Sequence, residues 1–283
     1  AAVFSFVLLR IRVWAGIFTA IITPLMVVFL GREILVHGAI QMQVGGWQAP
    51  LGIQLRADSL STAMLAISAI VLACSNFYAR SYFSGKAASR SFWPLWMFLW
   101  AALNALFLSA DIFNLYVTLE LLGLSAVALV ALSQTAEALS AAMRYLLVSL
   151  TGSLSYLMGV ALLYAANGTL SIKLLATAGS ASPSIATAFA LMAAGLIMKS
   201  ALFPMHFWLP PAHANAPAPV SAVLSALVVK ASFYILLRLW LMVFEPFLNP
   251  STAQLVGMLG ASAVIWGSVQ ALLAKRLKLL VAY

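Results

Sequence analysis

The sequence predicts an all-α integral membrane protein, a multi-span helical bundle with a broken helix near Lys199. Hydrophobic residues make up 64% of the 283 residues and charged residues only 7%, with a mean hydropathy of +1.07. Soluble domains are about 25% charged, so this composition excludes a soluble core. Apolar segments of the length that a membrane-crossing helix needs, about 20 residues, recur along the chain. One integral bundle is therefore expected.

Two spans precede the middle of the chain. The first is expected to run from Val13 to Leu30 and to end at Gly31. The second is expected from Leu60 to Ala79, where a basic loop follows it. The loop 31–59 between them has turn residues and then alternates at Ile53, Leu55 and Ala57, as a short surface hairpin does.

The next three spans carry their own boundary signals. A segment from Phe92 to Ala110 begins with Trp and Phe, which are typical of a membrane interface. Asp111 can cap the following helix, which is expected to reach Leu132, by accepting free backbone N–H groups. The span 140–166 contains Gly152, Ser155 and Gly159, small residues that permit close helix packing. The remaining expected spans are 185–203, 219–241 and 253–274.

Two lysines, Lys199 and Lys230, lie in apolar helical segments on either side of a proline-rich turn. A cation in hydrocarbon costs roughly 2.5 to 3.5 kcal/mol even on the lenient insertion scale, which favours a function for both. Pro204 is expected to break the first helix and to free the carbonyl of Ser200 beside Lys199. A broken helix at membrane depth occurs only inside protein or beside a wet cavity. The segment therefore indicates a polar pathway.

Glu120 is the third ionisable residue expected within the bundle. A carboxylate near Lys199 favours the charged lysine, and a desolvated amine without that partner releases its proton more readily. Glu120, Lys199 and Lys230 are therefore the candidate transport residues, although a purely structural salt bridge is the alternative. His206, in the turn, is a further candidate for the proton pathway. His213, Arg144 and Lys173 are expected to have loop or anchoring roles.

The loops predict the orientation in the membrane. If every span crosses once, one side of the membrane holds nine basic residues: Arg10, Arg12, Arg80, Lys86, Arg90, Arg144, Lys275, Arg276 and Lys278. The other side holds four: Arg32, Arg56, Lys173 and Arg238. Basic residues favour the cytoplasm, which places the 80–90 loop inside the cell and the 31–59 loop outside, in a multi-pass protein of the plasma membrane.

No cofactor, metal or nucleic acid is expected. Cys74 is the single cysteine and lies in an apolar run, where we interpret it as a core residue. The chain also has no Cys cluster, Gly-rich nucleotide loop or haem motif, so it is not a redox unit itself. Its net charge of +9 comes mainly from loops, which favours membrane anchoring over nucleic-acid binding.

Four stretches together resemble a known family. They are DIFNLYVTLELLGLSA around Glu120, LIMKSALFPMHFWLP around Lys199, the turn APAPVSA at 216–222, and ALVVKASFYILLRL around Lys230. In this order they resemble the antiporter-like membrane subunits of respiratory complex I, membrane-bound hydrogenases and Mrp-type Na⁺/H⁺ antiporters. The stretches QVGGWQAPLGIQLRAD at 43–58 and LNALFLSADIFNLYVTLE at 103–120 are most similar to the D-type component of Mrp antiporters.

The resemblance implies roles and an organisation. It implies that Glu120 and Lys199 form the glutamate–lysine pair of a first half-channel, and that Lys230 lies on a hydrophilic axis leading from it. Family members are built from two inverted five-helix units. We therefore expect N-terminal spans and an external hairpin over 1–110, a complete first unit over 92–241, and the start of a second, truncated unit over 242–283.

Three functions remain open. The first is proton or cation translocation through a Glu–Lys–Lys relay in a multi-subunit Na⁺/H⁺ antiporter. The second is the proton-pumping arm of a complex-I-like NADH:quinone oxidoreductase or membrane-bound hydrogenase, with the redox chemistry in other chains. The third is a structural scaffold, which the three buried charges oppose. The expected partners are other membrane subunits, protons, Na⁺ and the lipid bilayer.

Overall fold

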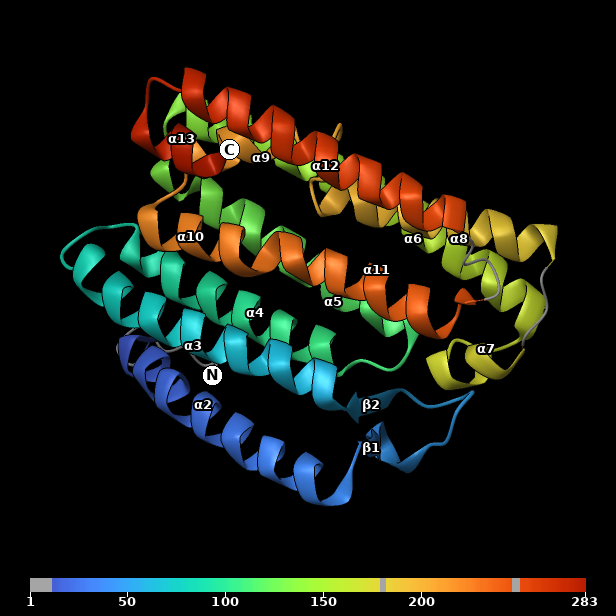
Figure 1. Ribbon diagram of the computed structural model, residues 1–283. Coiled ribbons are helices and arrows are strands. Elements are labelled where there is room, and N and C mark those ends of the chain that lie inside the picture. The colour runs from blue at the N-terminus through green and yellow to red at the C-terminus, as the bar shows by residue number, and fades with distance from the viewer. Residues whose placement is uncertain (1–11, 179–181, 246–249) are drawn as a thin grey trace.

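The computed structural model describes residues 12–178, 182–245 and 250–283 and consists almost wholly of helices (Figure 1). Seven helices within these residues are long and apolar enough to cross a membrane, which confirms the all-α integral membrane fold. The helices are α2 (Arg12–His37), α3 (Ser59–Tyr82), α4 (Ser89–Leu108), α5 (Ile112–Val130), α6 (Ala136–Asn167), α7 (Ile172–Ala178), α8 (Pro183–Lys199), α9 (Leu209–Asn215), α10 (Ala218–Val223), α11 (Val229–Met242), α12 (Pro250–Leu273) and α13 (Leu277–Ala282).

Helix α2 is longer than the sequence predicts. It passes through Gly31 and ends at His37, so the expected end at Gly31 is wrong. Gly31 faces Thr62 of α3, where an added Cβ would lie 3.6 Å from the Thr62 methyl carbon. Gly38 ends the helix instead, since its φ of 77° is the left-handed conformation that follows many helices. A packing glycine and a terminating glycine look alike in sequence.

The expected surface hairpin is confirmed. Strands β1 (Ile40–Gln43) and β2 (Gln54–Ala57) pair antiparallel, with Ile40 opposite Ala57 and Gln43 opposite Gln54. The amide of Ala110 donates to the Gln54 carbonyl (3.0 Å), which ties the hairpin to the connection between α4 and α5. Asp111 in that connection caps α5 as predicted, because its Oδ1 accepts from the amides of Phe113 (2.9 Å) and Asn114 (2.8 Å).

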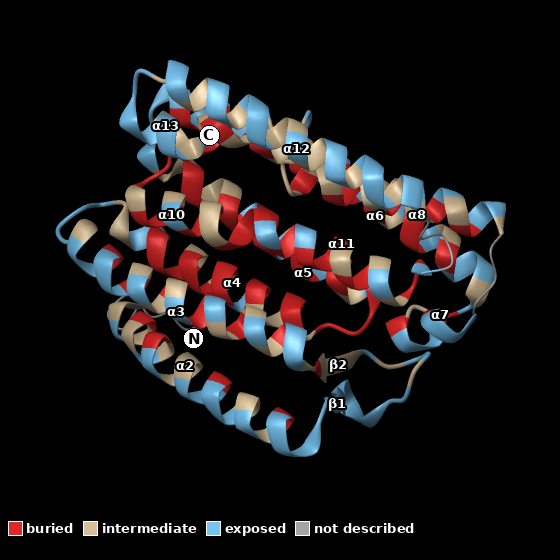
Figure 2. Ribbon diagram, in the orientation of Figure 1, coloured by how far each residue is buried: buried red, intermediate tan, exposed pale blue. Residues whose placement is uncertain are grey.

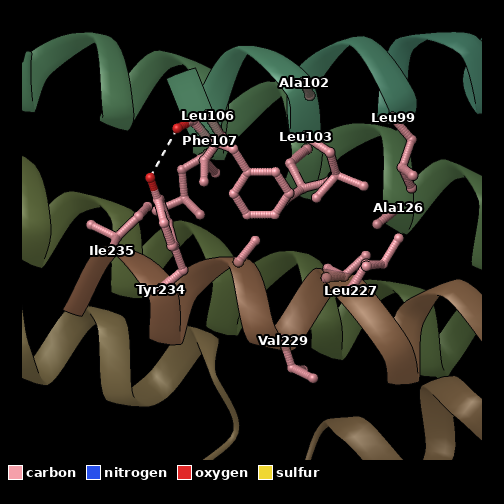
Figure 3. Close-up of a cluster of buried hydrophobic side chains, with 14 of the residues drawn as sticks. Leu99, Ala102, Leu103, Leu106, Phe107, Ala126, Leu227, Val229, Tyr234 and Ile235 are labelled. Atoms are coloured by element: carbon pink, nitrogen blue, oxygen red, sulfur yellow. Dashed lines mark hydrogen bonds between the residues drawn. The ribbon is translucent and has the colours of Figure 1, made fainter. Parts of the chain in front are cut away.

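The large apolar side chains of α4 form the centre of the bundle. Trp93, Trp96 and Trp100 are at most 1% exposed, and Figure 2 shows buried residues along α4, α5 and α11. Figure 3 shows Leu103 and Phe107 facing α11, where the Tyr234 hydroxyl donates to the Phe107 carbonyl (2.9 Å). This packing holds α11 against α4.

Helices α6 and α8 approach each other through glycines, as the small residues of α6 predict. A Cβ on Gly195 would lie 2.2 Å from the Gly152 carbonyl oxygen, and one on Gly159 would lie 2.7 Å from the Ala188 carbonyl oxygen. The Ser155 hydroxyl donates to the Leu191 carbonyl across the same interface (2.8 Å). Close contact of the two backbones brings the end of α8 into the bundle.

The helix break lies at Lys199, before the proline that was expected to cause it. Helix α8 ends at Lys199, and Ala201 has a φ of 52°, which is left-handed. Pro204 lies in the turn after the helix, so our explanation through a proline inside the helix is wrong. The Met198 carbonyl at the helix end accepts from the Trp208 indole N–H (3.1 Å), which satisfies a terminal acceptor. Helix α9 resumes at Leu209.

Helix α12 lies on the surface of the described part of the chain. None of its described side chains is buried, and it extends along the outside of the bundle in Figure 2. Trp266 approaches the turn between α8 and α9, with its ring centroid 6.2 Å from that of Phe203. Cys74 on α3 is also exposed, so its interpretation as a core residue is wrong.

The loops that carry the two groups of basic residues lie at opposite ends of the bundle, as expected if every span crosses the membrane once. The hairpin, α7 and the end of α11 lie at one end, and the α3–α4 loop and α13 lie at the other (Figure 1). The arrangement therefore supports the alternation of loops, while Arg10 lies outside the described residues. Which end faces the cytoplasm stays a prediction from the basic residues.

Single cysteines at Ser84 and Gln48, in a Cys74→Ala background, test this orientation. Both positions are exposed, and they belong to the loops at opposite ends. An impermeant thiol reagent added to intact cells is expected to label position 48 and not position 84, because the more basic loops face the cytoplasm. Labelling of position 84 before the cells are opened would reverse the orientation.

Candidate ion-translocation site

Glu120 and Lys199 meet inside the bundle. Lys199 Nζ lies 3.0 Å from Glu120 Oε1, and the side chains are 5% and 18% exposed. Glu120 lies in the middle of α5, whereas Lys199 is the last residue of α8. The carbonyl ends of a helix favour a cation in its last turn, so the helix end and the carboxylate both stabilise the ammonium.

Helix α6 completes this contact. The Ser153 hydroxyl donates to Glu120 Oε1, the same oxygen that accepts from Lys199. Glycines make room for the lysine, since a Cβ on Gly152 would lie 3.1 Å from Lys199 Cγ, and one on Gly123 would lie 3.7 Å from Lys199 Nζ. Three helices therefore converge on the pair.

A small cavity continues from Lys199 toward α11. It measures about 10 Å³ and is lined by Lys199 together with Tyr145, Ser149 and Ser232, as well as apolar side chains. This is close to the lower limit for holding one water molecule. The cavity therefore places the hydroxyl groups of three residues beside the lysine. These hydroxyls were not recognised from the sequence, although Ser149 and Ser153 lie one helical turn apart in an apolar helix.

Lys230 does not reach the Glu120–Lys199 pair. It is exposed in the described part of the chain, so the expectation of a lysine buried within the bundle is wrong for these residues. Its Nζ donates to the Ser225 carbonyl, and it lines an open pocket of about 460 Å³ with His213, Ser221 and Lys278. The helix direction turns Lys230 outward, which apolar neighbours in the sequence cannot reveal.

The two histidines lie in different places. His206 packs against Phe203, with ring centroids 5.6 Å apart, and lines a cavity of about 140 Å³ beside α12. Its Nδ1 has no hydrogen-bond partner among the described residues. His213, for which a loop or anchoring role was expected, is buried, and its Nδ1 lies 2.8 Å from Ser221 Oγ beside the Lys230 pocket. Within the described ranges, neither ring forms a hydrogen bond with the Glu120–Lys199 pair.

Metal ligands do not gather in the described residues. No group of three or more His, Cys, Asp or Glu side chains lies close enough there to hold a metal ion. The site consists instead of one carboxylate, one buried amine and several hydroxyl groups. Such a set is suited to holding and moving a proton.

Comparison with known proteins identifies relatives of two kinds. The N-type component of the NADH-quinone oxidoreductase of Desulforudis audaxviator is 36% identical over 259 residues, which is 89% of this chain and 51% of the relative. The D-type component of the Na(+)/H(+) antiporter of Alkalihalophilus pseudofirmus is 31% identical over 240 residues, or 83% and 48% of the two chains. The chain spans about half the length of these relatives. The predicted likeness to the D type is thus accompanied by a likeness to the N type.

Solved structures share the fold. A chain in the membrane-bound sulfane sulfur reductase, an archaeal respiratory membrane complex, superposes with a TM-score of 0.91 at 28% identity, over 100% of this chain and 59% of that one. A chain in the Mrp complex from Dietzia sp. DQ12-45-1b gives 0.88 at 24% identity, over 96% and 51%. At this identity the Mrp match shows the fold alone.

The middle and the C-terminal part of the chain carry the family match. Residues 109–283, which include Glu120, Lys199 and Lys230, match the family model described as NADH:quinone oxidoreductase/Mrp antiporter, TM. The chain therefore belongs to the NADH:quinone oxidoreductase/Mrp antiporter family of membrane subunits.

Proposed function

We propose that the chain translocates protons in exchange for Na⁺ as a membrane subunit of a multi-subunit Na⁺/H⁺ antiporter in the plasma membrane. The observation that carries the proposal is the buried contact of Lys199 Nζ with Glu120 Oε1, 3.0 Å long, where α8 ends inside the bundle. A buried ion pair is weak evidence for stability, because desolvation offsets its attraction. Its position at a helix break beside a water-sized cavity favours transport.

The proposed route begins at the Glu120–Lys199 pair. Lys199 holds a proton while Glu120 is charged beside it, and releases the proton toward Ser149, Tyr145 and Ser232 when the influence of Glu120 weakens. Lys230, on α11, is the next proposed carrier. The whole route lies within 92–241, the unit that we propose as one half-channel, whereas 1–110 supplies the outer spans and 242–283 begins a second unit. His206 is a weaker candidate, because it faces the α12 cavity.

A second function has a specific observation in its favour. The relative from Desulforudis audaxviator, at 36% identity, is a component of an NADH-quinone oxidoreductase. In that function the same Glu120–Lys199 pair moves protons, while other chains carry out the redox reaction. The two functions differ in the energy source that drives proton transfer at the Glu120–Lys199 pair and in the subunits that surround this chain.

Purification of the complete complex from its own membrane, through a tag on this chain, separates the two. An antiporter is expected to show no iron–sulfur or flavin absorption and, in proteoliposomes, to move protons when a Na⁺ gradient alone is applied. Lys199→Met is expected to stop this movement, whereas Lys173→Met, at an exposed position on α7, is the matched control. Proton movement that requires quinone reduction would favour the second function, and normal exchange by Lys199→Met would contradict both.

A further inference from the structure

The span that carries Lys230 contains an irregular turn. Helix α10, a wide π-helical turn at Leu224–Val228, and α11 form one continuous span from Ala218 to Met242. A π turn holds one extra residue, so it rotates the following side chains by about 100° relative to a regular helix. Lys230 is the second residue after the wide turn, and its Nζ donates to the Ser225 carbonyl inside the turn. The direction of Lys230 therefore depends on where the wide turn lies.

Arg238 anchors the other end of this span. Its side chain is 3% exposed, and Nη1 and Nη2 lie 3.0 and 2.8 Å from the two carboxylate oxygens of Asp58. Asp58 is the residue that caps α3, because its Oδ1 also accepts from the Ser61 amide (3.0 Å). A two-pronged contact of this kind restrains orientation as well as distance. It therefore opposes rotation of α11 about its axis.

The Asp58 carboxylate stays charged at physiological pH. Burial raises its pKa, but the hydrogen bonds from Arg238 and Ser61 outweigh burial and lower the pKa to about 2. A carboxyl group whose pKa is lower in the folded than in the unfolded state stabilises the fold at any pH above its unfolded-state pKa. This stabilisation is lost only as the pH falls toward the folded-state pKa. Asp58 is therefore an anionic partner for Arg238 at neutral pH.

Tyr234 provides a second restraint between Lys230 and Arg238. Its hydroxyl donates to the Phe107 carbonyl of α4 (2.9 Å; Figure 3), and the Arg238 guanidinium lies 5.0 Å from its ring centroid. Lys230, Tyr234 and Arg238 lie on successive turns of α11, and of the three only Lys230 is exposed in the described part of the chain. At the opposite end of the span, α10 packs against α3. Helix α3 thus contacts both ends of the span that contains the wide turn.

From these contacts we propose that Asp58 and Arg238 are positioning residues for Lys230. The ion pair fixes the rotation of α11 about its own axis relative to α3. It thereby keeps the wide turn at Leu224–Val228 and keeps the Lys230 amine at the Ser225 carbonyl. Loss of the pair frees α11 to rotate, and the wide turn then moves or closes. The value of this position for transport rests on the proposed function, but the position of Lys230 itself is measurable without transport.

The test measures how fast Lys230 reacts with a small membrane-permeant acetylating reagent in the intact complex. Mass spectrometry gives its rate relative to Lys86, which is exposed in the α3–α4 loop. Arg238→Lys keeps the charge but loses the two-pronged contact, and is expected to shift the Lys230/Lys86 ratio severalfold. Arg56→Gln is the matched control. Arg56 belongs to the hairpin, and its Nε lies 3.4 Å from the same Asp58 carboxylate. Its ratio is expected to stay at the wild-type value.

A double variant covers the case in which Arg238→Lys does not assemble. Asp58→Asn retains a capping oxygen for α3, and Arg238→Met fills similar space, so removing both charges together costs little in assembly. The double variant is expected to assemble, with a shifted Lys230/Lys86 ratio and slower ion exchange. A wild-type ratio in either variant overturns the proposal, as does a double variant that fails to assemble, because the pair would then serve folding alone. A shifted ratio combined with normal exchange would leave the positioning intact and remove Lys230 from the proposed function.

Discussion

Glu120→Gln is expected to stop ion exchange by the complete complex. The change removes the charge that stabilises the Lys199 ammonium at 3.0 Å, while the shape of the side chain is kept. Breaking a buried pair by removing one partner costs about 3–5 kcal/mol, so the amount of assembled complex is also expected to fall. Proteoliposome flux, normalised to the assembled complex, measures the effect on transport separately from assembly.

One further variant and one control make this result specific. Glu137→Gln is the same chemical change at an exposed position in the first turn of α6, and is expected to have no effect. Glu120→Asp keeps the charge on a shorter arm and is expected to retain part of the flux. Wild-type flux in Glu120→Gln would remove Glu120 from the mechanism.

The double change Glu120→Gln with Lys199→Met extends the same argument. It is expected to assemble better than either single change, since removing both members of a buried pair is often nearly neutral. It should still not transport, because no group remains to hold the proton. Strictly additive losses in assembly would argue against direct coupling of the two residues, despite their short distance.

Lys230→Arg is expected to cause the second large loss of exchange. An arginine keeps the positive charge, but its pKa is above about 12, so it can hardly release a proton. Because Lys230 is exposed in the described part of the chain, the longer side chain fits there without disturbing the core. Flux and assembly are therefore expected to separate, with flux lost and assembly kept.

The matched control for this change is Lys173→Arg, at an exposed position on α7. It makes the same substitution outside the proposed route and is expected to exchange ions normally. If Lys230→Arg also exchanged ions normally in the full complex, proton transfer at Lys230 would have to be abandoned, while the proposal for the Glu120–Lys199 pair would stand.

Local sequence alone determined the membrane class, most spans and one helix cap. Hydrophobicity over about 20 residues is a property of each segment by itself, so spans can be recognised without knowing their neighbours. The Asp111 cap is equally local, because its acceptor and donors lie within three residues. Glu120 and Lys199 also stood out by themselves, as charges in apolar segments. Gly31 shows the limit, since one glycine signal fits both packing and termination.

Tertiary structure decided how these residues are combined. Glu120 and Lys199 are 79 residues apart in sequence, and Asp58 and Arg238 are 180 apart, so neither distance follows from local pattern. The rotation of each helix is set by close packing such as that of Gly152 against Gly195. Lys199 at the end of α8 meets Glu120, whereas Lys230 on α11 is exposed among the described residues. A charge in an apolar segment marks a candidate, but only helix packing decides which partner it meets.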